Sequence, residues 1–259
     1  MSQKTTARIL LYDIEIASDI GDSWQKWNTN IHHYRRDWYM LCFAYKWLGE
    51  KKTHVVAQPD FKSYKKGSTD DRELVNALWD LFDEADIVIA HNGDSFDQKK
   101  SNTRMVINGR TPASPYFEID TKKVAKRYFG FTSNKLDDLA RQLGIKGKLD
   151  TGGYSLWLGC EEGDPKAWKK MKSYNKQDVW VLEQVYLRLR PWIKNHPPIN
   201  TIINNPTGCP TCGKGPLTKQ GVRATKTNTY QRYRCSNCRS WHHERIADYR
   251  QLEERMKYV

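Results

Sequence analysis

The stretch "ARILLYDIEIA", from Ala7 to Ala17, decides the fold because it combines an apolar run with two carboxylates. A short run of this composition predicts a buried central strand. Asp13 and Glu15 are two residues apart, so on a strand both side chains point to the same face. Two carboxylates on one face of a buried strand repel each other and lose hydration, at a cost on the order of several kcal/mol. A divalent cation is the simplest compensation, although a D-x-E pair at a strand end is common by itself.

Apolar runs and helical periodicity around this strand indicate how the rest of the domain is built. Further strands are expected at Trp38–Leu48, Thr53–Gln58, Asp86–Asn92 and Tyr116–Asp120. Helices are expected at Thr69–Ala85, Phe96–Ile107, Thr121–Phe129, Lys135–Leu143 and Ser173–Leu189, and Asp164 with Pro165 resembles the start of another helix. Because strands come first and then alternate with helices, the sequence predicts an α/β domain with a mixed β-sheet flanked by helices.

A second acidic motif, "HNGDSFD", runs from His91 to Asp97 and follows a buried strand. Asn92 and Gly93 suit a turn. Asp97 is then expected to project from the carboxyl edge of the sheet, where α/β folds usually place their chemistry. The alternative is that Asp97 caps the helix that begins there.

A third motif lies in "SYNKQDVWVL", from Ser173 to Leu182. Tyr174 and Asp178 are four residues apart, so on a helix they share one face. Alone, the pair could equally be a surface aspartate beside a half-buried tyrosine. Its meaning depends on the two acidic motifs upstream.

In order, D-x-E, N-x-x-x-F-D and Y-x-x-x-D resemble the proofreading-type 3′–5′ exonucleases of the DEDD superfamily, which have a ribonuclease H-like fold. The resemblance covers roughly residues 7 to 192. The segments "NKLDDLARQLGI" and "PWIKNHP" are similar to polymerase-associated members of this family, many of them encoded by phages. A sister subgroup carries histidine where this chain has Ser173, so the resemblance is to the tyrosine subgroup.

The resemblance implies a two-metal-ion mechanism with two Mg²⁺, or Mn²⁺ in their place. It implies that Asp13 bridges both ions, and that Glu15 and Asp178 help to hold the ion that carries the nucleophilic water. Asp97 is implied to hold the second ion, partly through water. Tyr174 is implied to orient the attacking water, because a phenol with an ordinary pKa near 10 is a poor base at neutral pH.

Other residues are candidates for nucleic-acid contacts. They are Asn92, Arg35, Arg36, Arg104, Arg223, Lys226, Arg232, Arg234 and Trp241. Arg104 could instead pair with an acid on the same helix. Trp24 and Trp27, which lie in the segment after the first motif, could stack on a nucleotide or could anchor the segment to the core. His91 is expected to be a packed or capping residue.

Four cysteines near the C-terminus form two C-x-x-C pairs, Cys209 with Cys212 and Cys235 with Cys238. Two such pairs predict a closed tetrahedral site for one structural Zn²⁺ in a small zinc ribbon. The alternative is two redox-active dithiols. Basic and aromatic residues are interleaved between and after the pairs, which suits phosphate contact and base stacking. The ribbon could instead dock on the exonuclease domain or on another protein.

These features divide the chain into an exonuclease domain over residues 1–194, a Pro- and Asn-rich linker over residues 195–208, and a zinc ribbon with a C-terminal tail over residues 209–259. The 259 residues fit one large domain and a small one. No internal repeat and no apolar run long enough to cross a bilayer is present in the sequence. A cytoplasmic protein is therefore expected, and the family resemblance implies a bacterium or a phage-infected cell as its source.

The formal net charge of +13, from 43 basic and 30 acidic residues, favours a polyanionic partner, with nucleic acid first and an acidic membrane surface second. The expected activity is removal of nucleotides from the 3′ end of DNA, preferably single-stranded, together with replication or repair proteins as possible partners. The same chemistry on RNA, or nucleic-acid binding without catalysis, are the alternatives. The motifs do not choose between DNA and RNA, because the 2′-hydroxyl is read by other side chains.

Overall fold

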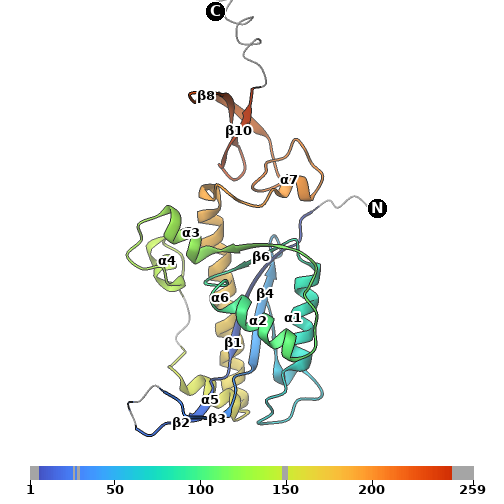
Figure 1. Cartoon of the computed structure of the whole chain (residues 1–259), viewed down its shortest axis with the longest axis vertical. Helices are drawn as coiled ribbons and strands as arrows, with labels where there is room; N and C mark the ends of the chain where they lie inside the picture. Colours follow the sequence, from blue (N-terminus) through green and yellow to red (C-terminus); the bar gives the residue numbers. More distant parts are fainter. Residues whose placement is uncertain (1–5, 26, 28–29, 148–150, 247–259) are drawn as a thin grey trace, which may run out of the picture. The chain divides into compact units, whose positions relative to one another are not determined.

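The computed structural model describes residues 6–25, 27, 30–147 and 151–246. The chain divides into two compact units, one over Arg8–Leu189 and one that contains the chain from Arg190 onward. The boundary between the units falls between Leu189 and Arg190, whereas the sequence analysis placed the end of the first domain at residue 194. Figure 1 shows the elements of both.

The first unit is built on a five-stranded mixed sheet with the order β5-β4-β1-β6-β7. Its strands are β1 (Ile9–Ile16), β4 (Met40–Trp47), β5 (His54–Ala57), β6 (Ile87–Ala90) and β7 (Phe117–Asp120). The first three pair antiparallel, whereas β6 runs parallel to β1 and β7 runs parallel to β6. The mixed sheet predicted from the sequence is confirmed.

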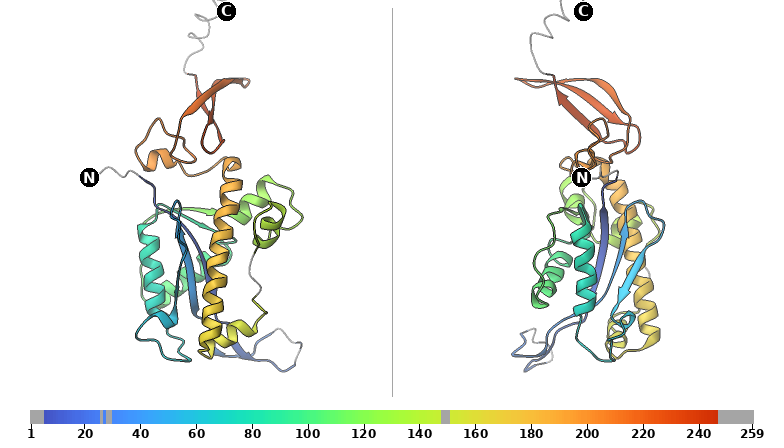
Figure 2. Two further views of the ribbon diagram at one scale, coloured as in Figure 1. Left: turned by 180° about the vertical axis from the view of Figure 1, so that it is seen from behind. Right: turned by 90° about the vertical axis from the view of Figure 1, so that its right-hand side faces the viewer.

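Helices cover both faces of this sheet, as the edge-on view in Figure 2 shows. They are α1 (Arg72–Glu84), α2 (Asp97–Ile107), α3 (Thr121–Tyr128), α4 (Leu136–Gln142), α5 (Ser155–Glu161) and α6 (Pro165–Leu189), with a short 3₁₀ turn at Gln58–Asp60. Helix α1 packs on one face and α6 on the other. The alternation of side chains along β1 sends Leu10, Tyr12 and Ile14 into the core beneath α1. The intervening residues of β1, which include Asp13, therefore face α6.

Three details of the first unit differ from the sequence prediction. Helix α6 is one helix of 25 residues, where a helix starting at 164–165 and another from Ser173 were expected. Nothing breaks it, because no proline or glycine follows Pro165 within its length. The segment after β1 forms a small hairpin of β2 (Ile20–Asp22) and β3 (His33–Arg36), and α5 was not anticipated.

The second unit contains a three-stranded antiparallel sheet with the order β10-β9-β8. Its elements are a 3₁₀ turn (Arg190–Trp192), α7 (Ile199–Ile202), β8 (Leu217–Ala224), β9 (Thr229–Cys235) and β10 (Trp241–Arg245). The expected linker at 195–208 is not simply extended chain, because α7 lies within it. The Ile199 amide donates to the Pro210 carbonyl at 2.7 Å, which ties α7 to the first cysteine pair.

Candidate active site and metal centre

The carboxylates of β1 and α6 converge at the α6 face of the sheet. One oxygen each from Asp13, Glu15 and Asp178 lies within 4.8 Å of the others. Asp178 is almost completely buried, with 1% of its surface exposed. Three carboxylates this close repel one another strongly where hydration is lost, so their oxygens suit a hard divalent cation such as Mg²⁺ or Mn²⁺.

Tyr174 lies against this carboxylate group, one helical turn before Asp178. Burial, followed by the negative charges of Asp178 and Glu15, raises the pKa of Tyr174 well above its ordinary value. Its ring contacts that of Trp157 edge to face, with 6.1 Å between centroids. The phenol is therefore neutral and carries a proton that it can donate.

Two residues that the sequence analysis did not single out hold the carboxylates in place. Asn175, which is fully buried, donates from Nδ2 to Oδ2 of Asp13 at 2.7 Å and to its carbonyl at 3.3 Å. Trp157 on α5 donates from Nε1 to Oε2 of Glu15 at 3.2 Å. The i, i+3 spacing of Asn175 and Asp178 was a usable signal. No local pattern identified Trp157.

Asp97 lies at the edge of β1 and not within the group of three carboxylates. Pairing between β1 and β6 extends from Ile9 to Leu11, so the next part of β1 continues past its parallel neighbour. Asp97 occupies that edge, where its Oδ1 accepts the Ile14 amide at 3.3 Å. The N-cap of α2 is Phe96, and Asp97 is the first residue inside the helix. The buried Asp97 is thus fixed beside the strand segment that carries Asp13 and Glu15.

The residues around the second motif have structural partners. His91 uses both ring nitrogens, one with the Thr121 hydroxyl at 2.9 Å and one with the Asn134 carbonyl at 3.0 Å. The packing role expected for His91 agrees with these contacts. Asn92 has a positive φ of 70°. Its side-chain Oδ1 accepts from Lys122 Nζ at 3.1 Å, and its backbone amide donates to Asp120 Oδ1 at 2.9 Å.

A cavity of about 360 Å³ opens beside Asp13. Its lining consists of Asp13, His91, Lys122, Lys135, Leu136 and Asp137. The two lysines supply positive charge next to the carboxylates, which suits a phosphate of a bound strand.

The arginines proposed for the nucleic acid in this unit are engaged elsewhere. Arg104 makes a bidentate pair with the buried Asp71, at 2.6 and 2.7 Å, and its side chain is 13% exposed. The sequence analysis allowed a pair with an acid on the same helix, but the partner Asp71 is instead the N-cap residue of α1. Arg36 pairs with Glu161, and Arg35 pairs with Asp22 at 3.2 Å on the surface. Of these arginines, Arg35 has the exposure that a strand contact needs.

The four cysteines of the second unit converge as their spacing predicts. Their Sγ atoms lie within 4.8 Å of one another, with 3.7 Å between Cys209 and Cys238 and 3.7 Å between Cys212 and Cys235. Tetrahedral Zn²⁺ with bonds of about 2.3 Å requires sulfur atoms roughly 3.8 Å apart, so the group fits this ion. His242 lies behind it, with Nε2 at 3.2 Å from Cys209 Sγ and 2.8 Å from the Ser240 hydroxyl.

The three-stranded sheet presents an aromatic and basic surface. Trp241 is half exposed, and the guanidinium groups of Arg232 and Arg234 each lie 5.5 Å from its ring centroid. Arg223 and Lys226 are also exposed. The remaining candidates of the sequence analysis therefore gather on one small sheet with solvent access.

Comparisons with known proteins agree on the fold. A family model described as the RNase H superfamily matches residues 33–190, which is more than half of the chain and begins after β1. A family B DNA polymerase from the hyperthermophilic archaeon Pyrobaculum calidifontis is structurally similar, with a TM-score of 0.55 and 15% sequence identity. The similarity covers 86% of this chain and 32% of the polymerase, so the chain spans about a third of that protein. A search of curated proteins finds no match.

The polymerase similarity, at this identity, concerns the fold alone. The family match, together with the mixed sheet flanked by helices, confirms the ribonuclease H-like fold predicted from the sequence. No helix among the residues that the structure describes is long and apolar enough to span a membrane.

Proposed function

Because this chain belongs to the RNase H superfamily, we propose that it is a metal-dependent 3′–5′ exonuclease of the DEDD tyrosine subgroup acting on DNA, preferably single-stranded. The observation that carries the proposal is the convergence of Asp13, Glu15 and Asp178 within 4.8 Å, with Tyr174 against them. These residues come from two elements far apart in the sequence. The packing of α6 against β1 does not by itself require three carboxylates at one point.

In this proposal Asp13, Glu15 and Asp178 hold Mg²⁺ or Mn²⁺, and Asp97 completes the site for a second ion from the edge of β1. The bound ions supply positive charge that offsets the negative charge of the phosphodiester transition state and acidify a water molecule. Trp157 and Asn175 fix the positions of Glu15 and Asp13 through their hydrogen bonds. Outer partners of this kind orient ligands and tune their affinity.

Tyr174 has the role of a hydrogen-bond donor. A phenol with an ordinary pKa near 10 is protonated at neutral pH, so Tyr174 can orient the attacking water but does not remove its proton. The edge-to-face contact with Trp157 limits where the ring can move. Tyr174 is therefore a positioning group for the nucleophile.

We assign the second unit a supporting role as a zinc ribbon that binds nucleic acid. The exposed Trp241 between two arginines resembles a site that combines stacking with phosphate contact. The double variant Arg232→Ala/Arg234→Ala should reduce the salt dependence of binding by about one unit of slope for each phosphate that the variant no longer binds. The matched control is Lys51→Ala/Lys52→Ala, which removes two exposed charges from the first unit. Equal slopes in both variants would exclude the role.

The test of the exonuclease uses single-stranded DNA and RNA of one sequence, each labelled at the 5′ end and incubated with Mg²⁺, Mn²⁺ or EDTA. A metal-dependent ladder that shortens from the 3′ end is expected with DNA. Asp13→Ala should abolish it, and Tyr174→Phe should slow it less severely. Ser173→Ala on the same helix is the control.

A ladder with RNA alone would replace DNA by RNA as the substrate. Salt-sensitive binding without any ladder would show a nucleic-acid-binding protein that does not hydrolyse its ligand. Products that start from internal positions would contradict exonuclease action.

A further inference from the structure

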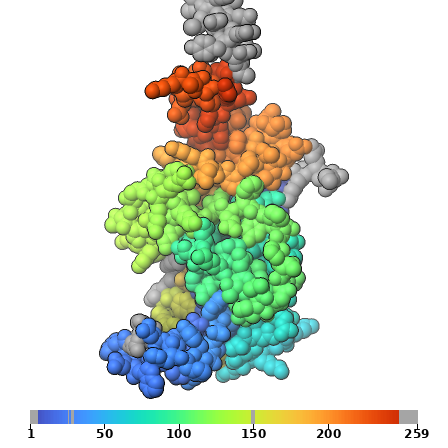
Figure 3. All heavy atoms as spheres, viewed as in Figure 1, coloured from blue at the N-terminus to red at the C-terminus, as the bar shows by residue number. Residues whose placement is uncertain are grey.

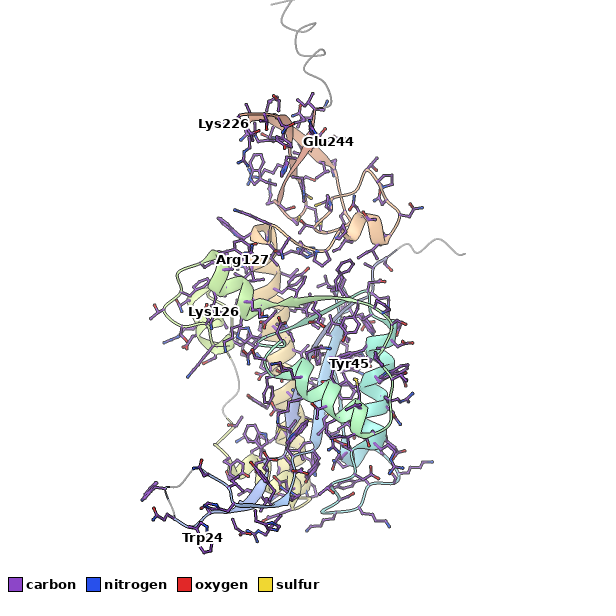
Figure 4. The ribbon with its side chains drawn as sticks, in the orientation of Figure 1. Trp24, Tyr45, Lys126, Arg127, Lys226 and Glu244 are labelled. Atoms are coloured by element: carbon purple, nitrogen blue, oxygen red, sulfur yellow. The ribbon has the colours of Figure 1, made fainter. Side chains whose placement is uncertain are left out.

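The β2–β3 hairpin carries two tryptophans that the core does not use. Trp24 is 83% exposed and Trp27 is 86% exposed, so neither anchors the segment to the sheet. Figure 3 shows this hairpin (blue) as a surface feature of the first unit, and Figure 4 shows Trp24 near its outer end. The Trp24 ring lies 5.9 Å from that of His32. Exposed indole rings of this size are costly in water and mark a contact surface.

The base of the hairpin is fastened to the rest of the unit. Arg36 forms an ion pair with Glu161 of α5, and its Nη2 donates to the Ser18 carbonyl at 3.1 Å. The hydroxyl groups of Ser18 and Tyr154 are hydrogen-bonded. These contacts fix the base of the hairpin to α5 and to the residue before it.

The same helix connects the hairpin to the carboxylates. Helix α5 contributes Glu161 to the hairpin base and Trp157 to the hydrogen bond with Glu15. Nine residue-to-residue steps lead from Glu15 to Trp24, a distance of at most about 30 Å along the chain. That distance is comparable to the length of the several nucleotides that a single-strand binding groove contacts.

The composition of the hairpin fits bases better than a protein partner. Its exposed rings alternate with polar residues, and Ile31 is its exposed aliphatic side chain among the described residues. The core of a protein interface needs surrounding groups that exclude water, which a narrow two-stranded ribbon lacks. Base stacking needs only an open ring face and tolerates every sequence, as an exonuclease requires.

We propose that Trp24 and Trp27 form a stacking platform that binds the bases of a single strand whose 3′ end occupies the carboxylate site. This inference rests on the proposed nuclease function and adds the route by which its substrate is held. It also predicts a preference for single strands, because paired bases offer no free face to the rings.

The first experiment separates the platform from the carboxylate site by substrate length. The p-nitrophenyl ester of thymidine 5′-monophosphate has one nucleotide, whereas a 20-nucleotide single strand can extend to the hairpin. The ratio of kcat/KM for the 20-mer to that for the ester should fall at least about tenfold in Trp24→Ala/Trp27→Ala, because each stacked base contributes roughly fivefold or more. Trp24→Phe/Trp27→Phe, which keeps a ring at both positions, should recover most of the ratio.

The matched control is Phe117→Ala, which removes a half-exposed ring at the start of β7. It should keep the wild-type ratio. An unchanged ratio in the double alanine variant would overturn the platform, as would an equal fall in the phenylalanine variant. No hydrolysis of either substrate by the wild-type chain would instead refute the nuclease function.

Binding gives a second readout that does not need catalysis. In an Asp13→Ala background, anisotropy of a labelled single strand should show affinity at least about tenfold weaker after removal of both rings. The slope of log K against log salt should stay the same, because stacking releases no counterions. Equal affinity with and without the rings would overturn the proposal whatever the activity.

Discussion

At the scale of single residues, the cluster of three carboxylates favours metal binding but lowers the stability of the metal-free protein. Two unit charges 4–5 Å apart repel each other by roughly 3–4 kcal/mol at an effective dielectric constant of about 20. Asp13, Glu15 and Asp178 lie within 4.8 Å of one another and are held by partners such as Asn175. Without a cation this arrangement strains the fold, and with one it is favourable.

Asp178→Asn should therefore raise the unfolding temperature in EDTA, by roughly 2–4 °C for each kcal/mol of repulsion that is relieved. Mn²⁺ at a hundredfold excess over its Kd should stabilise the wild type by about 2.7 kcal/mol and the variant much less. Thermal melts of both proteins with and without Mn²⁺ measure this. Equal Mn²⁺ shifts for the two proteins would contradict the ligand role of Asp178.

Asn175→Ala should weaken the affinity of the site for the metal ion that hydrolysis needs, although it removes no carboxylate. The change leaves Asp13 Oδ2 without its 2.7 Å donor, and removal of such an outer partner costs about 10–100-fold in metal affinity or activity. The Mn²⁺ concentration for half-maximal rate measures the effect. Ser173→Ala, on the same helix but exposed, should leave that concentration unchanged. A similar change in both variants would point to a general effect on α6.

At the scale of elements, α6 has to be held in register on the sheet, because it carries both Tyr174 and Asp178. Lys46 of β4 and Glu183 of α6 form a buried ion pair at 2.6 Å, with side chains 7% and 8% exposed. The pair joins the two elements at the face where the carboxylates converge. A buried pair adds little net stability, but removal of one partner leaves an uncompensated charge.

Glu183→Ala should destabilise the first unit by about 3–5 kcal/mol, because Lys46 would remain buried without its partner. The double variant Lys46→Met/Glu183→Leu should recover most of this stability, since it removes both charges and restores apolar volume. Urea denaturation followed by circular dichroism gives the free energies of unfolding. Equal destabilisation of the single and double variants would show that packing, not charge, holds α6 here.

At the scale of the whole molecule, the two units depend on different sources of stability. The first has extensive clusters of buried apolar residues on both faces of its sheet. Among the described residues of the second, Cys209, Cys235 and Cys238 form a buried cluster, and the partly buried Cys212 and Leu217 pack against it. A unit with so small a core depends on its metal to fold.

Removal of Zn²⁺ should therefore unfold the second unit and leave the first one folded. Cys235→Ser should lose the metal and eliminate the corresponding thermal transition, while the circular dichroism of the sheet and helices of the first unit persists. Metal analysis should give one Zn²⁺ per wild-type chain. A single cooperative transition in both proteins would contradict the separate dependence on metal.

What the sequence determined by itself was local. The two-residue alternation in "ILLYDIEI" gives a buried strand with two carboxylates on one face, and the four-residue spacing of Tyr174 and Asp178 gives a shared helix face. The cysteine pairs likewise follow from short spacings. Such features depend on periodicity, which neighbouring residues fix through backbone geometry.

Only the tertiary structure decided which residues meet across long separations. It brought Asn175 to Asp13 and Trp157 to Glu15, it used Arg104 for Asp71, and it left Trp24 exposed. Burial and partner choice depend on packing between elements distant in sequence, and no local pattern specifies them. Short motifs therefore identify the carboxylates, the tyrosine and the cysteines, while the fold decides their supporting contacts and which aromatic side chains are exposed.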